Sequence, residues 1–161
     1  MTSPPKNRFS QGIAFLYIIF LISLDQSIKF IILRNFTLGE SLPVINSVFH
    51  ITLVFNKGAA FGIFANATIA FILISALVIV IISFFLSRPN ISYDTRLALA
   101  SILAGATSNL IDRLRFGYVV DFLDFRIWPV FNIADAAITL GTLWLVWKIL
   151  IKDRKNASGV V

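Results

Sequence analysis

Four long apolar segments constrain this 161-residue chain more than any other feature of its sequence. They cover about residues 12–33, 68–86, 96–112 and 133–151. An α-helix needs about 20 residues to cross the hydrocarbon core of a bilayer, so each segment is a candidate membrane span. We therefore expect an all-α integral membrane protein with four transmembrane helices, folded as a single membrane domain over residues 1–161.

The composition supports a membrane protein and excludes several other classes. Hydrophobic residues make up 58% of the chain and charged residues only 14%, whereas soluble domains are nearer half apolar and a quarter charged. The net charge is +6, but the basic residues stand singly at the ends of apolar runs, which suits phospholipid headgroups rather than nucleic acid. Without cysteine, and with His50 as the single histidine, we expect no metal, no cofactor and no special role for His50.

Charge and small residues predict how the spans are arranged. With both termini on one side, that side holds eight Lys and Arg residues and the other side six. We therefore place both termini in the cytoplasm, with outer loops at about residues 34–67 and 113–132. The third span is rich in Ala, Ser and Gly, including Gly105, which predicts a central place in the bundle.

The first outer loop contains a β-strand signal. Its segment Phe49–Phe55 is aromatic and β-branched, and Asn56 to Gly58 follow it with turn residues. This pattern predicts a small extracytoplasmic β element with a loop cap on the bilayer.

Charged residues within spans cost at least about 2.5 kcal/mol on insertion scales and are functional candidates. Asp25 and Lys29 are four residues apart and can pair, either to fix helix packing or to serve a site. Asn109, Asp112 and Arg113 share one helical face, which favours a hydrogen-bonding cavity over an interfacial belt.

Two further aspartates suggest chemistry at the outer rim. Asn132 is a suitable N-cap for the fourth span, but capping explains Asp135 less well. Two carboxylates around one water, such as Asp121 and Asp135, can share a proton and hydrolyse a carbonyl compound. From spacing alone the pair is a weak signal, and Asp112 and Asp124 compete as candidates.

Five motifs together resemble the bacterial lipoprotein signal peptidase family, the type II signal peptidases. The resemblance covers essentially the whole chain and rests on residues 25–29, 56–62, 105–113, 119–122 and 131–135. It implies an aspartic endopeptidase of the bacterial inner membrane that cleaves diacylglyceryl-modified prolipoproteins just before the lipidated cysteine. Ser108 departs from the family pattern, which usually has glycine there.

The resemblance also implies roles for individual residues. Asp121 and Asp135 correspond to the catalytic pair, and the other residues bind substrate or support the site: Asp25, Lys29, Asn56, Gly58, Gly105, Asn109, Asp112, Arg113, Asn132 and Ala134. The implied partners are lipid-modified prolipoprotein signal peptides and membrane phospholipid, and we expect a monomer. Gly58 and Gly62 are interpreted as turn residues.

Two alternatives stay open at this point. A proton-coupled membrane carrier would use Asp25, Lys29, Asp112 and Asp135 as a relay. A non-catalytic membrane assembly factor would tolerate loss of Asp121. As a finer hypothesis for the peptidase, the helix N-terminus favours the charged form of Asp135 and leaves the shared proton on Asp121.

Overall fold

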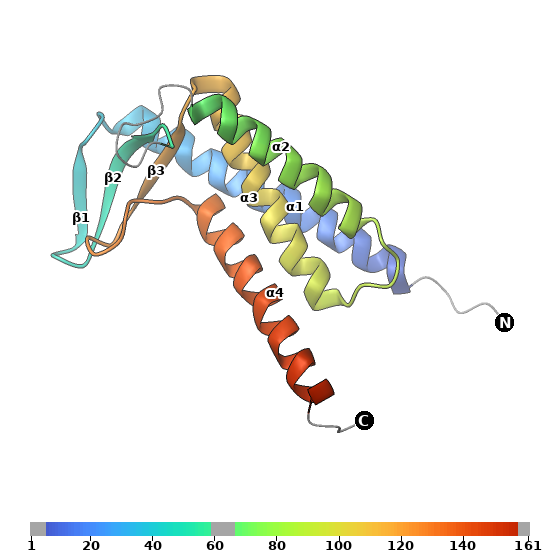
Figure 1. Cartoon of the computed structure of the whole chain (residues 1–161). Helices are drawn as coiled ribbons and strands as arrows, with labels where there is room; N and C mark the ends of the chain where they lie inside the picture. Colours follow the sequence, from blue (N-terminus) through green and yellow to red (C-terminus); the bar gives the residue numbers. More distant parts are fainter. Residues whose placement is uncertain (1–5, 59–66, 158–161) are drawn as a thin grey trace.

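The computed structural model describes residues 6–58 and 67–157, which form four helices and three strands. In chain order the elements are α1 (Lys6–Asn35), β1 (Ser41–Ile45), β2 (Phe49–Asn56), α2 (Ala67–Leu86), α3 (Tyr93–Phe116), β3 (Val119–Asp124) and α4 (Ile133–Ala157). All four apolar segments are helical. Figure 1 shows the strands gathered at one end of the helical bundle, opposite the first turn of α1 and the last turns of α4.

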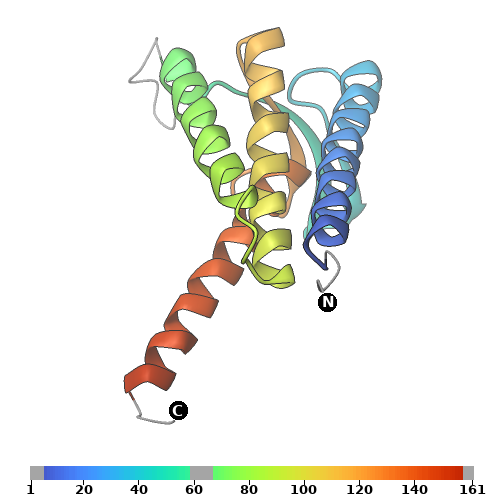
Figure 2. The same cartoon turned by 90° about the vertical axis from the view of Figure 1, so that its right-hand side faces the viewer.

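Helix α3 occupies the middle of the bundle and packs against α1, α2 and α4 (Figure 2). Its small residues explain this place, since Ala100, Ala104 and Ser108 are buried with almost no exposed surface. A Cβ atom added at Gly105 would collide with the carbonyl oxygen of Ala134 on α4. The central position predicted from the small residues is confirmed, and glycine is what allows the two backbones to approach.

Among the residues that the structure describes, three helical segments are long and apolar enough to cross a membrane, namely Ser10–Asn35, Thr68–Leu86 and Ile133–Ile151. Helix α3 has 24 residues and a length of about 36 Å at 1.5 Å per residue, but its polar residues lower its hydropathy. These polar residues point inward, because Ser108, Asn109 and Asp112 are all buried. The helix is therefore less apolar than its neighbours because its functional face is turned into the protein.

The strands form one antiparallel sheet in the order β1-β2-β3. The strand predicted at Phe49–Phe55 is confirmed as β2, whereas β1 and β3 were not predicted. Pro43 lies within β1, where an edge strand tolerates the missing N–H group. The sheet packs on α1 through a cluster that joins Ile32 to Leu53, Val120 and Phe122.

Helix α3 extends further than the sequence predicted. Arg113 was placed at the start of an outer loop, but the helix continues to Phe116 and ends at Gly117. Gly117 has a φ of 79° and its N–H donates to the carbonyl oxygen of Arg113 at 3.0 Å. Glycine adopts this left-handed conformation without steric cost, which is why the helix stops there.

Candidate active site

Asp121 lies on β3 with 1% of its surface exposed and is held by two amide donors. Asn56 Nδ2, at the end of β2, donates to Oδ2 at 2.8 Å. Asn132 Nδ2, just before α4, donates to Oδ1 at 2.7 Å. The sheet and the start of α4 therefore fix both oxygens of this carboxylate.

Asp135 lies in the first turn of α4 and is tied to the same asparagine. Its backbone N–H donates to Asn132 Oδ1 at 2.8 Å, and its Oδ2 faces the backbone N–H of Asn132 at 3.4 Å. This is a reciprocal N-cap, with Asn132 capping the helix and Asp135 reaching back. Asn109 Nδ2 of α3 donates to Asp135 Oδ1 at 2.7 Å, so Asp135 has a role in the site besides capping.

A buried charge cluster lies next to the two carboxylates. Lys29 Nζ contacts Asp25 Oδ2 and Asp112 Oδ2, each at 2.7 Å, and donates to Asn109 Oδ1 at 3.2 Å. Its three ammonium protons thus have three acceptors. Asp25 also accepts the backbone N–H of Ala134 at 3.1 Å, so α1 is bonded directly to the first turn of α4.

Two residues that sequence reasoning gave no role belong to this cluster. Ser108 Oγ donates to Asp25 Oδ2 at 2.6 Å, and Gln26 Nε2 donates to Asp112 Oδ1 at 2.8 Å. Gln26 follows Asp25 directly in the first motif. This adjacency was the one sequence feature that could have indicated a role for Gln26 in the site. Ser108 replaces the usual family glycine with a hydroxyl that the cluster uses.

The remaining predicted residues surround the carboxylates at different distances. Gly58 has a φ of 76° and donates its N–H to Asn56 Oδ1 at 2.8 Å, which agrees with a turn. Arg113 lies with its guanidinium carbon 5.2 Å from the centre of the Phe71 ring and 3.5 Å from Ser75 Oγ through Nη1. Gly62 lies outside the described residues.

Burial and charge give Asp121 an unusual protonation equilibrium. Burial is the largest cause and, with the charge of Asp135, raises the pKa of Asp121 to about 7. Hydrogen bonds from Asn56 and Asn132 act in the opposite direction and are outweighed. A carboxyl group with this pKa is a proton donor near neutral pH.

Asp124, which competed with Asp121 on sequence grounds, has a different environment. Burial acts to raise its pKa, but hydrogen bonds from Thr52 and from the backbone and side chain of Arg126 outweigh burial and lower it. Its carboxylate accepts from Thr52 Oγ1 at 2.8 Å and pairs with Arg126 at 2.9 Å. Asp124 is thus held as an anion by partners outside the network of Asp121.

Two cavities meet at Asp135. One, of about 230 Å³, lies among α2, α3 and α4 and has Asn109, Arg113 and Asp135 among its otherwise mainly apolar lining. The other, of about 500 Å³, lies between α4 and the segment that follows β3, and Trp128 and Phe131 contribute to it. Asp135 is therefore reachable from apolar space on two sides, which suits a substrate with apolar parts.

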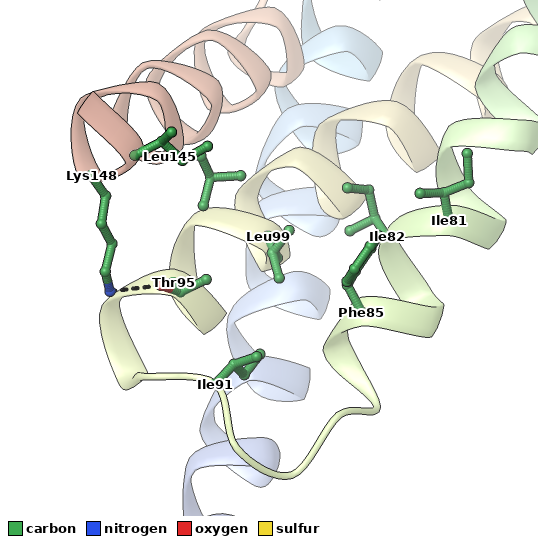
Figure 3. A pocket seen from close by; sticks show the side chains of 9 residues that line it. Ile81, Ile82, Phe85, Ile91, Thr95, Leu99, Leu145 and Lys148 are labelled. Atoms are coloured by element: carbon green, nitrogen blue, oxygen red, sulfur yellow. Dashed lines mark hydrogen bonds between the residues drawn. The ribbon is translucent and has the colours of Figure 1, made fainter. Parts of the chain in front are cut away.

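A third cavity, of about 490 Å³, lies at the opposite end of the bundle (Figure 3). Its lining is aliphatic and aromatic apart from Thr95 and Lys148. It contains no carboxylate and lies far along the helices from Asp121 and Asp135. It is therefore not a candidate for the chemistry described above.

The arrangement offers a proton donor and a carboxylate base joined through one asparagine, which is the chemistry needed to activate water against a carbonyl group. Within residues 6–58 and 67–157, no three acidic or histidine side chains are arranged to hold a metal ion. Metal independence stays a prediction. The predicted site residues lie within or around this one network, whereas the competing candidate Asp124 is held apart from it by Thr52 and Arg126.

The chain is similar to proteins of several bacteria. It is 53% identical to the lipoprotein signal peptidase of Moorella thermoacetica over 132 residues, covering 81% of this chain and 88% of the relative. It is 43% identical to the lipoprotein signal peptidase of Clostridioides difficile over 143 residues, covering 88% of this chain and 97% of the relative.

Solved structures and a family profile agree with these relatives. A bacterial membrane enzyme determined by the in meso method superposes with a TM-score of 0.80 at 34% identity, covering 90% of this chain and 91% of that one. A second structure of a bacterial membrane enzyme also gives a TM-score of 0.80, at 33% identity and with 86% of this chain covered. The profile described as signal peptidase (SPase) II matches residues 17–151, and the chain therefore belongs to the signal peptidase II family of bacterial membrane peptidases.

Proposed function

We propose that this peptidase is an aspartic endopeptidase that removes the signal peptide of lipid-modified prolipoproteins, cutting just before the lipidated cysteine. The names of the relatives support the substrate class. The single observation that carries the catalytic type is that Asn132 bonds to both aspartates: its amide donates to the Asp121 carboxylate, and its carbonyl oxygen accepts the backbone N–H of Asp135. The raised pKa of Asp121, about 7, agrees with one proton shared between them.

The reaction follows from the hydrogen bonds. Asp135 accepts hydrogen bonds from Asn109 and Asn132 and lies at a helix N-terminus. Both features stabilise a carboxylate, so we assign Asp135 the role of base. It takes a proton from the attacking water, while protonated Asp121 gives its proton to the carbonyl oxygen. The tetrahedral intermediate collapses as the C–N bond breaks. Asp135 passes its proton to the leaving amine, and one hydroxyl of the intermediate returns a proton to Asp121 as the carbonyl group re-forms. The products are a carboxylic acid on the signal peptide and a free amine on the cysteine.

The buried cluster is a support for this pair. Lys29 connects Asp25 and Asp112 with Asn109, and Asn109 in turn donates to Asp135. Asp112 also accepts the backbone N–H of Val120, which precedes Asp121. Each catalytic carboxylate is thus positioned from α1 and α3 as well as from its own strand or helix.

The proposed setting is the bacterial cytoplasmic membrane, with α3 as a fourth span between the three apolar helices. Both termini would lie in the cytoplasm. The sheet, the carboxylates and the connections from α1 to α2 and from α3 to α4 would lie toward the outer face. The apolar cavities beside Asp135 would receive the signal helix and acyl chains from the surrounding phospholipid. The protein would act as a monomer.

The test is cleavage of a diacylglyceryl-modified prolipoprotein by the purified full-length protein. Asp121→Asn and Asp135→Asn should each reduce kcat by about 10²- to 10⁴-fold, as expected for a lost acid or base. Asp94→Asn is the matched control, since Asp94 pairs with Lys148 at the other end of the bundle, and it should cleave like the wild type. EDTA should leave the rate unchanged.

Full turnover by either active-site variant would refute the assignment of the pair. The same assay separates the alternatives, because a proton-coupled carrier or an assembly factor would not cleave the substrate.

A further inference from the structure

His50 and Arg126 line a polar cavity of about 440 Å³ at the far end of the sheet, together with Pro43, Asn46 and Ser47. His50 pairs with Asp124 in the register of β2 and β3, whereas Asp121 pairs with Val54. Four residues of β2 separate the two positions, or about 13 Å along a strand. The cavity is therefore distinct from the carboxylate pair.

A chain of hydrogen bonds sets the tautomer of His50. Thr52 Oγ1 donates its one proton to Asp124 Oδ2 at 2.8 Å, so in its 2.8 Å contact with Ser41 Oγ it must accept. Ser41 therefore donates its one hydroxyl proton to Thr52. In its 3.2 Å contact with His50 Nδ1, the serine oxygen must then accept. Neutral His50 therefore carries its proton on Nδ1 and has a bare Nε2.

The bare Nε2 is the unusual atom of this cavity. It is buried and has no hydrogen-bond partner among the described residues, although buried polar atoms normally have one. Arg126 lines the same cavity, with 48% of its side chain exposed and one Nη1 contact to Asp124. Four guanidinium protons remain for other acceptors. The lining thus includes a histidine acceptor and a cation, together with the polar side chains of Asn46 and Ser47.

The residues next to the cavity lining in the sequence are apolar and exposed. Val44, Ile45 and Val48 beside the hairpin turn are 54–56% exposed, and Ile127 and Trp128 after Arg126 are 95% and 68% exposed. The sheet extends sideways from the end of the bundle (Figure 1). Apolar side chains with a tryptophan around polar groups are typical of the interface between lipid and water.

We propose that this cavity binds the headgroup of a membrane phospholipid. The phosphate contacts the Arg126 guanidinium, and an N–H or O–H group of the headgroup, as in ethanolamine or glycerol, donates to His50 Nε2. Because Nε2 is buried without a ligand, this contact requires the His50 ring to shift toward the cavity. A choline headgroup offers the phosphate but no N–H or O–H donor. The ligand class follows from these protein groups. A hydrogen-bond acceptor and a cation in the cavity are matched by a ligand that carries a hydrogen-bond donor and an anion.

The test uses the fact that His50 is the only histidine. In full-length protein labelled with ¹⁵N-histidine, in maltoside micelles near neutral pH, NMR should show Nδ1 protonated and Nε2 bare. Short-chain phosphatidylethanolamine should move the Nε2 resonance, with an apparent affinity about two- to tenfold higher than phosphatidylcholine, as one net hydrogen bond contributes.

Two variants keep the histidine probe and separate the contacts. Arg126→Gln should weaken both lipids, whereas Arg115→Gln, at an exposed arginine outside the cavity, should not. Ser41→Ala should release the Nδ1 proton and mix the tautomers.

The proposal is wrong if wild-type Nε2 is protonated in the neutral ring, or if the two lipids shift it equally. It is also wrong if inorganic phosphate alone reproduces the shift at the same concentration, since the cavity would then be a simple anion site. None of these readouts depends on folding of a variant or on peptidase activity.

Discussion

At the scale of single residues, Asn132 links chemistry with helix formation. Its amide group donates to Asp121 and its carbonyl oxygen caps the helix that carries Asp135. Because one side chain makes both contacts, a shift at the start of α4 would change the position of the Asp135 carboxylate relative to that of Asp121. The N-cap assigned to Asn132 from sequence is therefore only part of what this residue does.

The first prediction concerns the pH dependence of cleavage. The pKa of Asp121 is raised to about 7, so the protonated donor is present below pH 7 and is lost as the pH rises through 7. We expect kcat to fall on the alkaline side of about pH 7. The hydrogen bond from Asn56 lowers the pKa of Asp121, so Asn56→Ala should raise that pKa and move the fall to higher pH.

A pH–rate profile of each protein checks this prediction. Lys57→Ala, at the exposed position beside Asn56, is the matched control and should leave the profile in place. A shift of the Asn56→Ala profile to lower pH would contradict the assignment of the proton to Asp121.

The second prediction concerns the buried cation. Lys29→Met would leave Asp25 and Asp112 buried without their positive partner, and removing one member of a buried ion pair costs about 3–5 kcal/mol. Thermal unfolding in micelles should show a clearly lowered Tm. The same change at exposed Lys57 should stay within about 0.5 kcal/mol.

A double variant distinguishes charge from packing. Lys29→Met with Asp112→Asn removes one of the uncompensated carboxylates, so its cost should be smaller than the sum of the two single changes. Strict additivity would show that the loss comes from packing of the lysine stem.

At the scale of elements, the close contact of α3 with α4 depends on two glycines, which have no side chain to keep the helices apart. Gly105 of α3 lies against Ala134 and Ile138, and Gly141 of α4 lies against Ala98 and Ile102. Ala134 also donates its N–H to Asp25. Close approach of these helices therefore brings the first turn of α4, and Asp135 with it, to the buried cluster.

The third prediction follows from this contact. Gly105→Ala should push α3 and α4 apart, because its Cβ would collide with backbone atoms of Ala134. We expect a loss of about 1–3 kcal/mol, as for overpacked cores, together with lower cleavage activity. Gly12→Ala on α1, where a Cβ would meet nothing within 4 Å, should keep full activity. Equal Tm values for the two variants would contradict this account.

At the scale of the whole molecule, the sheet and the membrane spans meet at one end of the bundle. The carboxylate pair belongs to β3 and the first turn of α4. The first turn of α1 and the last turns of α4 lie at the other end of the helices (Figure 1). Helix α4 diverges from α2 toward its C-terminal end (Figure 2). In the proposed topology the end of the bundle that carries the sheet lies near one surface of the bilayer, which would suit a substrate that is anchored there by lipid.

The fourth prediction concerns orientation in the membrane. The chain contains no cysteine, so each introduced cysteine reports one position. A membrane-impermeant maleimide applied to intact cells should label Lys57→Cys, beside the sheet, and should label Asn90→Cys, between α2 and α3, only after the membrane is opened. The reverse pattern would invert the proposed topology.

The sequence by itself determined the apolar helices, the central place of α3 and the identity of the residues that gather at the site. Apolar runs and small residues act locally, so their consequences follow from composition and spacing. Tertiary structure alone decided that Asp121 lies on a strand, that Ser108 and Gln26 join the Lys29 cluster, and that Asp124 is held apart by Thr52 and Arg126. These outcomes depend on contacts between residues that are distant in the chain. The protonation of an aspartate, for example, is set by its burial and its hydrogen bonds, which cannot be deduced from the residue type alone.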